Sequence, residues 1–152
     1  MYLDRKSPEN AGVLAYLCLD AGTRKNPSIE PPPSGSTWHY GSHPDIIEYL
    51  WESLAPQLPA DCRALVCGKP ALVSPRRGVI FAVALGTEFA LRLPPAEFAL
   101  AQAAGTELVH HYRTAQVTLD LPARFGTHWV FGSFDPRESE WCVAALEFAE
   151  RA

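Results

Sequence analysis

Apolar residues recur at helical spacing in four stretches of the chain. In the clearest stretch, which begins at Ser42 and ends near Pro56, apolar side chains fill one face and acidic side chains the other. Further helices are predicted for residues 8–21, 94–104 and 136–151, which open on proline or capping residues. A strand over residues 13–19 is the alternative for the first of these, because that run is short and densely apolar.

The middle of the chain alternates short apolar runs with turn residues, which is typical of an antiparallel meander. The runs cover residues 63–67, 69–73, 78–85 and 88–93, and Gly86-Thr87 predicts a hairpin between the last two. Residues 79–85 are apolar on both faces, as in a central strand, whereas Ala90 and Arg92 alternate with apolar residues as in a strand with one buried face. Shorter strands are predicted at 110–113, 116–119 and 129–131. Helices at both ends of such a meander predict an α+β fold, organised as a single domain over residues 1–152.

Residues 23–41 form a proline-rich segment for which neither a helix nor a central strand is expected. Its last residues and those that follow, 37–44, are rich in aromatic and histidine side chains. We therefore expect this long loop to dock onto the domain rather than to act as a free linker.

Composition and charge narrow the classes of function. The chain has 152 residues, of which 47% are hydrophobic, so it can build a substantial core. The formal net charge is -4, and lysine and arginine are not clustered, so nucleic acid is an unlikely partner. The longest purely apolar run, 79–85, is too short to span a membrane, and residues 1–20 do not resemble a signal peptide. These features predict a cytoplasmic protein with no membrane partner, and the alanine, proline and arginine content suggests a bacterial source.

The four cysteines are all expected to be reduced, with Cys18 and Cys142 at least half buried on helices. Cys62 and Cys67 are not spaced as zinc ligands and do not form a Cys-x-x-Cys pair. A disulfide between any two cysteines would overturn the argument for a reducing compartment. No motif in the chain predicts a bound metal or another cofactor.

The stretch from Cys67-Gly68-Lys69-Pro70 through residues 79–83 to Leu91-Arg92-Leu93-Pro94 resembles the TfoX N-terminal domain and the MmcQ/YjbR-like proteins. Those are small bacterial α+β domains in which a helix leads into a strand meander and further helices follow. The resemblance covers roughly residues 44–150 and includes the later Trp129 and the terminal helix. It implies a fold but assigns no site, because the family has no agreed catalytic residues.

Two groups of side chains are candidates for chemistry. His39 and His43, with Asp45 close by, have the residue types of a divalent-metal or acid/base cluster, and the alternative is that they hydrogen-bond locally or face solvent. Arg76 and Arg77 lie on a predicted turn, where their guanidinium groups would either bind a carboxylate or phosphate or remain solvated.

The scarcity of convergent catalytic groups favours a non-enzymatic module that binds another protein, for example an immunity-type or regulatory partner. Its candidate binding residues are Trp38, His39, Tyr40, His43, Arg76 and Arg77. The alternative is a small metal-dependent or acid/base enzyme that uses His39, His43 and Asp45. The sequence does not define an oligomeric state.

Overall fold

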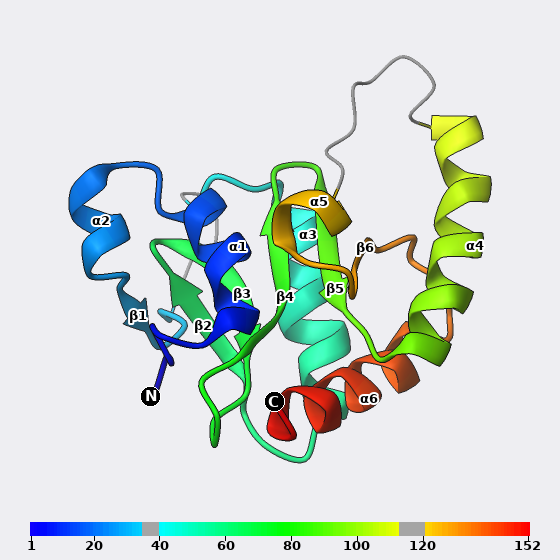
Figure 1. Cartoon of the computed structure of the whole chain (residues 1–152). Coiled ribbons are helices and arrows are strands. Elements are labelled where there is room, and N and C mark those ends of the chain that lie inside the picture. Colours follow the sequence, from blue (N-terminus) through cyan, green and yellow to red (C-terminus); the bar gives the residue numbers. More distant parts are fainter. Residues whose placement is uncertain (35–39, 113–120) are drawn as a thin grey trace.

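One six-stranded antiparallel sheet organises the protein (Figure 1). The computed structural model describes residues 1–34, 40–112 and 121–152, with only the backbone for 105–112. Within these residues the strand order follows the chain, and every neighbouring pair is antiparallel. The strands are β1 (Ile29–Glu30), β2 (Arg63–Val66), β3 (Lys69–Val73), β4 (Ile80–Leu85), β5 (Glu88–Arg92) and β6 (Trp129–Phe131). The predicted α+β meander with helices at both ends is confirmed.

Helices cover both faces of the sheet (Figure 1). On one face lie α1 (Pro8–Leu17) and α5 (Leu121–Phe125), and on the other lie α3 (Pro44–Glu48) and α6 (Glu138–Glu150). The α3 helix continues as a π-helical segment, η1 (Tyr49–Leu54), and a 3-10 turn, η2 (Ala55–Gln57). Near the margins of the sheet lie α2 (Ala21–Lys25) and α4 (Pro95–Tyr112). None of the described helices is long and apolar enough to cross a bilayer.

Each face of the sheet has its own hydrophobic core. Leu14 and Trp129 belong to the core under α1 and α5, and Trp51 and Phe81 belong to the core under α3, η1 and α6. Trp51 is 5% exposed, and its Nε1–H donates to the carbonyl oxygen of Ala71 at 3.2 Å. The central strands are therefore apolar on both faces, as buried strands must be.

The hairpins form where the turn residues predict them. Leu85 pairs with Glu88 across Gly86-Thr87, and Val66 pairs with Lys69 across Cys67-Gly68. Gly86 has a φ of 73°, and Cys67 and Gly68 have φ of 48° and 74°. Positive φ values are what two-residue hairpin turns require, and glycine adopts them without steric cost.

The prediction that β5 has one buried face is wrong. Residues 89–92 are all buried, because α1 and α5 cover the face that alternation assigned to solvent. Arg92, at the end of the strand, is only 6% exposed. A charged side chain is thus enclosed on this side of the sheet.

The N-terminal region also differs from the expectation. The helical interpretation of residues 13–17 is confirmed and the strand alternative is wrong, but α1 ends at Leu17 rather than near residue 21. Asp20 accepts a hydrogen bond from the Thr23 amide at 2.8 Å and so starts a separate helix, α2. Residues 23–41 were expected to lack regular structure, yet Ile29 pairs with Val66 at the edge of the sheet.

The segment after β5 holds the largest error in the predicted elements. Helix α4 does not end near residue 104 but continues through Gly105 to Tyr112, so residues 110–112 are helical and not a strand. One glycine costs a helix only about 1 kcal/mol, so Gly105 alone does not end it. The helix α5 was not predicted, and Arg113 and residues 116–119 lie outside the described residues. The predicted strand at 129–131 and the predicted terminal helix are confirmed.

Cys18 and Cys67 form a disulfide, so the prediction that all four cysteines are reduced is wrong for this pair. Cys18 follows the last residue of α1, and Cys67 lies in the turn between β2 and β3, with 5.6 Å between their Cα atoms. Cys62 and Cys142 are free and buried, and Cys142 lies on α6 as expected. The argument from the cysteines to a reducing compartment therefore loses its support.

Candidate functional site

The aromatic segment proposed for binding is described only in part. Trp38 and His39 lie outside the described residues. Tyr40 is half-buried, and the centroid of its ring lies 6.4 Å from that of Trp51. The chain is therefore anchored on the η1 helix at Tyr40.

His43 acts as the N-cap of α3. Its Nδ1 accepts a hydrogen bond from the Asp45 amide at 3.1 Å, and its own amide donates to the carbonyl oxygen of Gly86 at 2.8 Å. The imidazole is exposed and lies 3.8 Å from the Asp45 carboxylate. Within the described part of the chain, no three His, Cys, Asp or Glu side chains are grouped to hold a metal ion. The convergence of His39 with this pair lies outside the described residues.

The two turn arginines lie far along the sheet from His43. Arg76 and Arg77 are exposed in the turn between β3 and β4, at the opposite end of β4 from Gly86, which binds the His43 amide. Arg77 donates from Nε to the carbonyl oxygen of Glu150 at 3.1 Å, which ties the turn to the end of α6. The structure thus does not bring the turn arginines and His43 together into one site.

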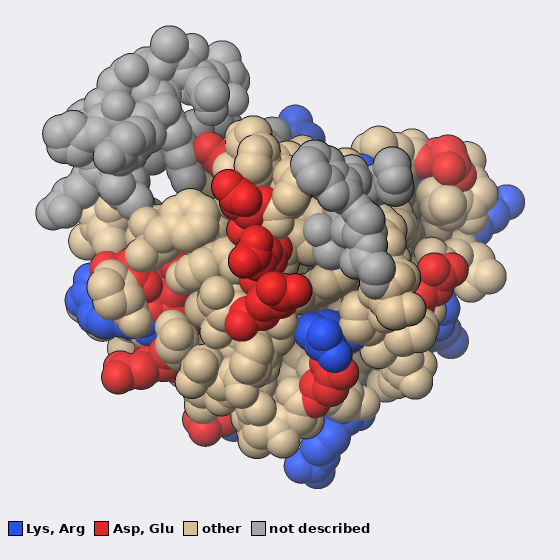
Figure 2. All heavy atoms as spheres, turned by 180° about the vertical axis from the view of Figure 1, so that it is seen from behind, with Lys and Arg blue, Asp and Glu red and all other residues tan. Residues whose placement is uncertain are grey.

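The face formed by α3 and η1 is acidic. Figure 2 shows a column of acidic side chains at the centre of the view from behind. Asp45, Glu48 and Glu52 are the exposed acidic residues of these two helices. This surface repels anionic ligands, and nucleic acid above all.

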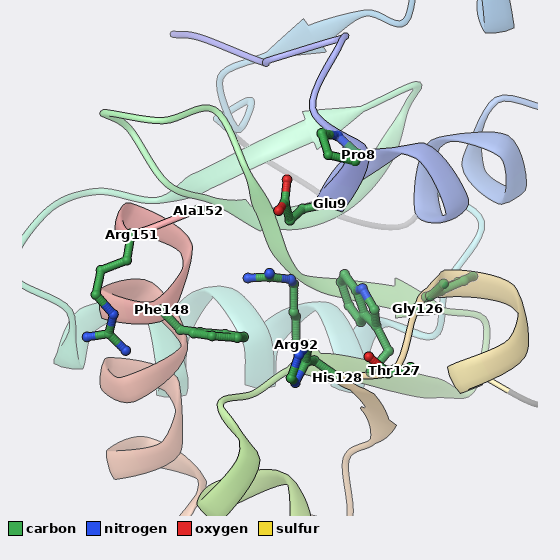
Figure 3. A pocket seen from close by; sticks show the side chains of 11 residues that line it. Pro8, Glu9, Arg92, Gly126, Thr127, His128, Phe148, Arg151 and Ala152 are labelled. Carbon is green, nitrogen blue, oxygen red and sulfur yellow. The ribbon is translucent and has the colours of Figure 1, made fainter.

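A pocket of about 400 Å³ lies at one end of the sheet, where elements from distant parts of the sequence meet (Figure 3). Its walls come from the first turn of α1, the end of β5, residues 125–129 and the end of α6. This volume falls within the range of ordinary small-molecule sites.

Arg92 is the buried charge of this pocket. Its Cζ atom lies 4.4 Å from the centroid of the Phe148 ring, in a cation–π contact. Its Nη1 atom is buried and has no hydrogen-bond partner among the described residues. Burial lowers the pKa of the guanidinium group, and the negative charge of Glu9 opposes that shift. Arginine nevertheless remains charged in proteins, so the pocket holds a permanent cation.

Trp129 supplies a second unsatisfied donor. Its side chain is 1% exposed, and Phe125 packs against it edge-on with 5.3 Å between the ring centroids. Its Nε1 is buried and lacks a partner in the described part of the structure. A buried N–H without a partner costs about 1–3 kcal/mol, so it is unusual for two residues that line one pocket each to hold one.

The rim of the pocket adds charge of both signs. Arg151 lies near Phe148, with its Cζ atom 6.0 Å from the ring centroid, and the His128 ring contacts the same phenyl group. Glu9 lines the pocket from α1, and a hydrogen bond from Ser7 lowers the pKa of its carboxyl group. The arrangement can bind an anionic group at Arg92.

This pocket was not found from the sequence. Arg92 occupies a position that alternation assigns to solvent, and from the sequence Trp129 could either line a pocket or belong to the core. The one available signal is an arginine directly between two leucines, Leu91 and Leu93, in a strand. That pattern indicates a buried arginine only when both faces of the strand are known to be covered by helices.

In a second buried acidic residue, Glu138, both carboxylate oxygens accept hydrogen bonds. Tyr49 donates its hydroxyl to Oε1 at 2.5 Å, and the Ser133 amide donates to Oε2 at 2.8 Å. Burial raises the pKa of the Glu138 carboxyl group, and these two hydrogen bonds oppose the increase. Burial and the Glu138 carboxylate raise the pKa of Tyr49. Because both carboxylate oxygens have donors, the pair anchors the neighbouring loop, where Phe134 has a φ of 60°.

Comparisons with protein-family models, with curated proteins and with solved structures found no match for this chain, so its function is argued from the Arg92 pocket itself.

Proposed function

We propose that this protein is a non-enzymatic binding module that holds the carboxylate or phosphate group of a ligand in the Arg92 pocket. The observation that carries the proposal is the pair of buried, unpartnered donors, Arg92 Nη1 and Trp129 Nε1, which belong to two residues that line one cavity. Native proteins pair nearly all buried donors, so an unpaired donor calls for a bound ligand, a bound water or a functional role. An oxyanion supplies acceptors for both.

The energetics favour an anion over a neutral ligand. A hydrogen bond to a charged group contributes about 1.5–3 kcal/mol, roughly twice a neutral one, and the low-dielectric wall around Arg92 strengthens the attraction. The aromatic ring of Phe148 supports the guanidinium group from the side. Binding would therefore add hydrogen bonds to a cation that the fold already holds in place.

The partner, enzyme, family and location predicted from the sequence are separate proposals, which rest on the sequence and not on the Arg92 pocket. A protein partner of the immunity or regulatory type would use the segment from Trp38 to His43, and the enzyme alternative would use His39, His43 and Asp45. The relationship to the TfoX and MmcQ/YjbR-like domains is likewise a proposal that rests on sequence resemblance. A cytoplasmic location is the least supported of these, because disulfides such as Cys18–Cys67 are rare in reducing compartments.

Isothermal titration calorimetry with two probes, 3-phenylpropionate and inorganic phosphate, tests the binding proposal. We expect saturable binding of at least one probe to the wild type, and about tenfold or greater weakening in Arg92→Gln, which removes the charge. Arg124→Gln is the matched control, because it removes an exposed positive charge from α5, beside the pocket. Failure of both probes to bind at millimolar concentration, or equal binding to Arg92→Gln, would refute the proposal.

A further inference from the structure

The Arg92 pocket contains a second charge, of opposite sign to the first. Glu9 from α1 and Arg92 from β5 both line the pocket (Figure 3). Ser7 Oγ donates to Glu9 Oε2 at 2.7 Å and so restrains the carboxylate. None of the ion pairs formed by the described residues joins Glu9 to Arg92. The pocket is therefore lined by two residues of opposite charge that are not joined in an ion pair.

This separation restricts which ligand fits. A purely anionic ligand gains attraction from Arg92 and meets repulsion from Glu9, which is strongest for a dianion such as phosphate. A purely cationic ligand is attracted by Glu9 and repelled by Arg92. A ligand that carries one charge of each sign satisfies both residues.

Glu9 is charged under ordinary conditions. The hydrogen bond from Ser7 lowers the pKa of its carboxyl group, and the positive charge of Arg92 adds to this effect. The attraction between Glu9 and Arg92 is thus present although no ion pair joins the two groups.

We propose that the ligand of the Arg92 pocket is a small zwitterion of the amino-acid class, with its carboxylate at Arg92 and Trp129 and its ammonium group at Glu9. This inference rests on the proposed function and narrows it to one ligand class. Phe125 and Phe148 supply apolar surface for the ligand's side chain. A pocket of about 400 Å³ accommodates a free amino acid or a short peptide.

A set of matched ligands tests the two-charge requirement on the wild-type protein by calorimetry. Phenylalanine carries both charges, 3-phenylpropionate lacks the ammonium group, and phenethylamine lacks the carboxylate. We expect phenylalanine to bind about tenfold more tightly than either analogue, since each lacks one charged hydrogen bond. Alanine and propionate repeat the comparison without the aromatic ring.

The Glu9→Gln variant tests whether Glu9 binds the ammonium group of the ligand. In this variant, phenylalanine is expected to bind no more tightly than 3-phenylpropionate, while 3-phenylpropionate binds as in the wild type or more tightly. Glu147→Gln, on the exposed side of α6 next to Phe148, is the control and should change neither affinity. The dipeptide alanylphenylalanine separates the two sources of such a zwitterion, because its charges lie farther apart: if it binds more tightly than phenylalanine and loses the difference in Glu9→Gln, the ligand is a peptide.

The outcomes separate this inference from the proposed function. If each carboxylate binds as tightly as its amino-acid counterpart and Glu9→Gln changes nothing, the zwitterion inference is overturned while anion binding at Arg92 stands. If no carboxylate binds, both fail. The ligand comparisons use only the wild-type chain, so they decide the matter even if Glu9→Gln does not fold.

Discussion

Replacing Arg92 with methionine tests whether this arginine serves ligand binding or stabilises the fold. Methionine is an unbranched apolar side chain that reaches about as far as the arginine Nε, and it has neither charge nor N–H groups. The change removes a buried unpartnered donor, which costs the wild type about 1–3 kcal/mol. It also removes the cation–π contact with Phe148, which contributes about 0.5–2 kcal/mol. We expect the free energy of unfolding to lie between about 1 kcal/mol below and about 2.5 kcal/mol above the wild-type value.

Urea unfolding followed by circular dichroism measures this difference, with thermal melting as a second readout. For a chain of this size, 1 kcal/mol corresponds to about 2–4 °C, so the melting temperature should lie between about 4 °C below and about 10 °C above that of the wild type. Arg124→Met, an exposed change on α5, should stay within about 0.5 kcal/mol of the wild type.

A loss of about 3 kcal/mol or more in Arg92→Met would refute this reasoning. Losses of that size accompany the breaking of a buried, fully paired charge network. They would mean that Arg92 stabilises the fold through contacts and is not an open donor held for a ligand.

Three further perturbations test the structure around the pocket. Trp51→Ala should lower the free energy of unfolding by about 3–5 kcal/mol, because it opens a cavity under η1, and an unchanged melting temperature would contradict the placement of this side chain. Reduction of the Cys18–Cys67 disulfide should cost about 3–4 kcal/mol, given its sequence separation of 49, whereas the Cys18→Ala/Cys67→Ala variant should melt equally with and without reductant. The folded-state pKa of Glu138 is raised, so its contribution to stability is fully present below the unfolded pKa and is lost as pH rises through the folded value. Unfolding free energies measured from pH 4 to 8 should show this loss in the wild type and not in Glu138→Gln; identical slopes would contradict it.

Local signals explain the parts of the fold that the sequence predicts well. The hairpins across Gly86-Thr87 and Cys67-Gly68 depend on turn residues at fixed positions between apolar runs. The helix that carries Trp51 is defined by its apolar periodicity and a cap at its start. Such features need no knowledge of what packs against them.

The pocket and the disulfide depend instead on contacts between distant segments. Glu9 and Arg92 line the same pocket only because α1 packs on the face of the sheet that carries the Arg92 side chain. Cys18 meets Cys67 because the end of α1 lies next to the turn between β2 and β3. Alternation along β5 assigned Arg92 to solvent, since a single strand contains no information about a second layer of helices. His39 and His43 are candidates for a metal or acid/base site because they are close in sequence. In the structure, His43 caps the start of α3.

The indole N–H resonance of Trp129 gives the most direct test of anion binding in the pocket. In a titration of ¹⁵N-labelled protein with 3-phenylpropionate or phenylalanine, this resonance should shift downfield and saturate as Nε1–H gains an acceptor, and the shift should be absent in Arg92→Gln. The indole of Trp51 already donates to the Ala71 carbonyl and serves as an internal reference that should not move. A Trp129 resonance that stays in place at saturating ligand, or that moves no more than that of Trp51, would contradict the account.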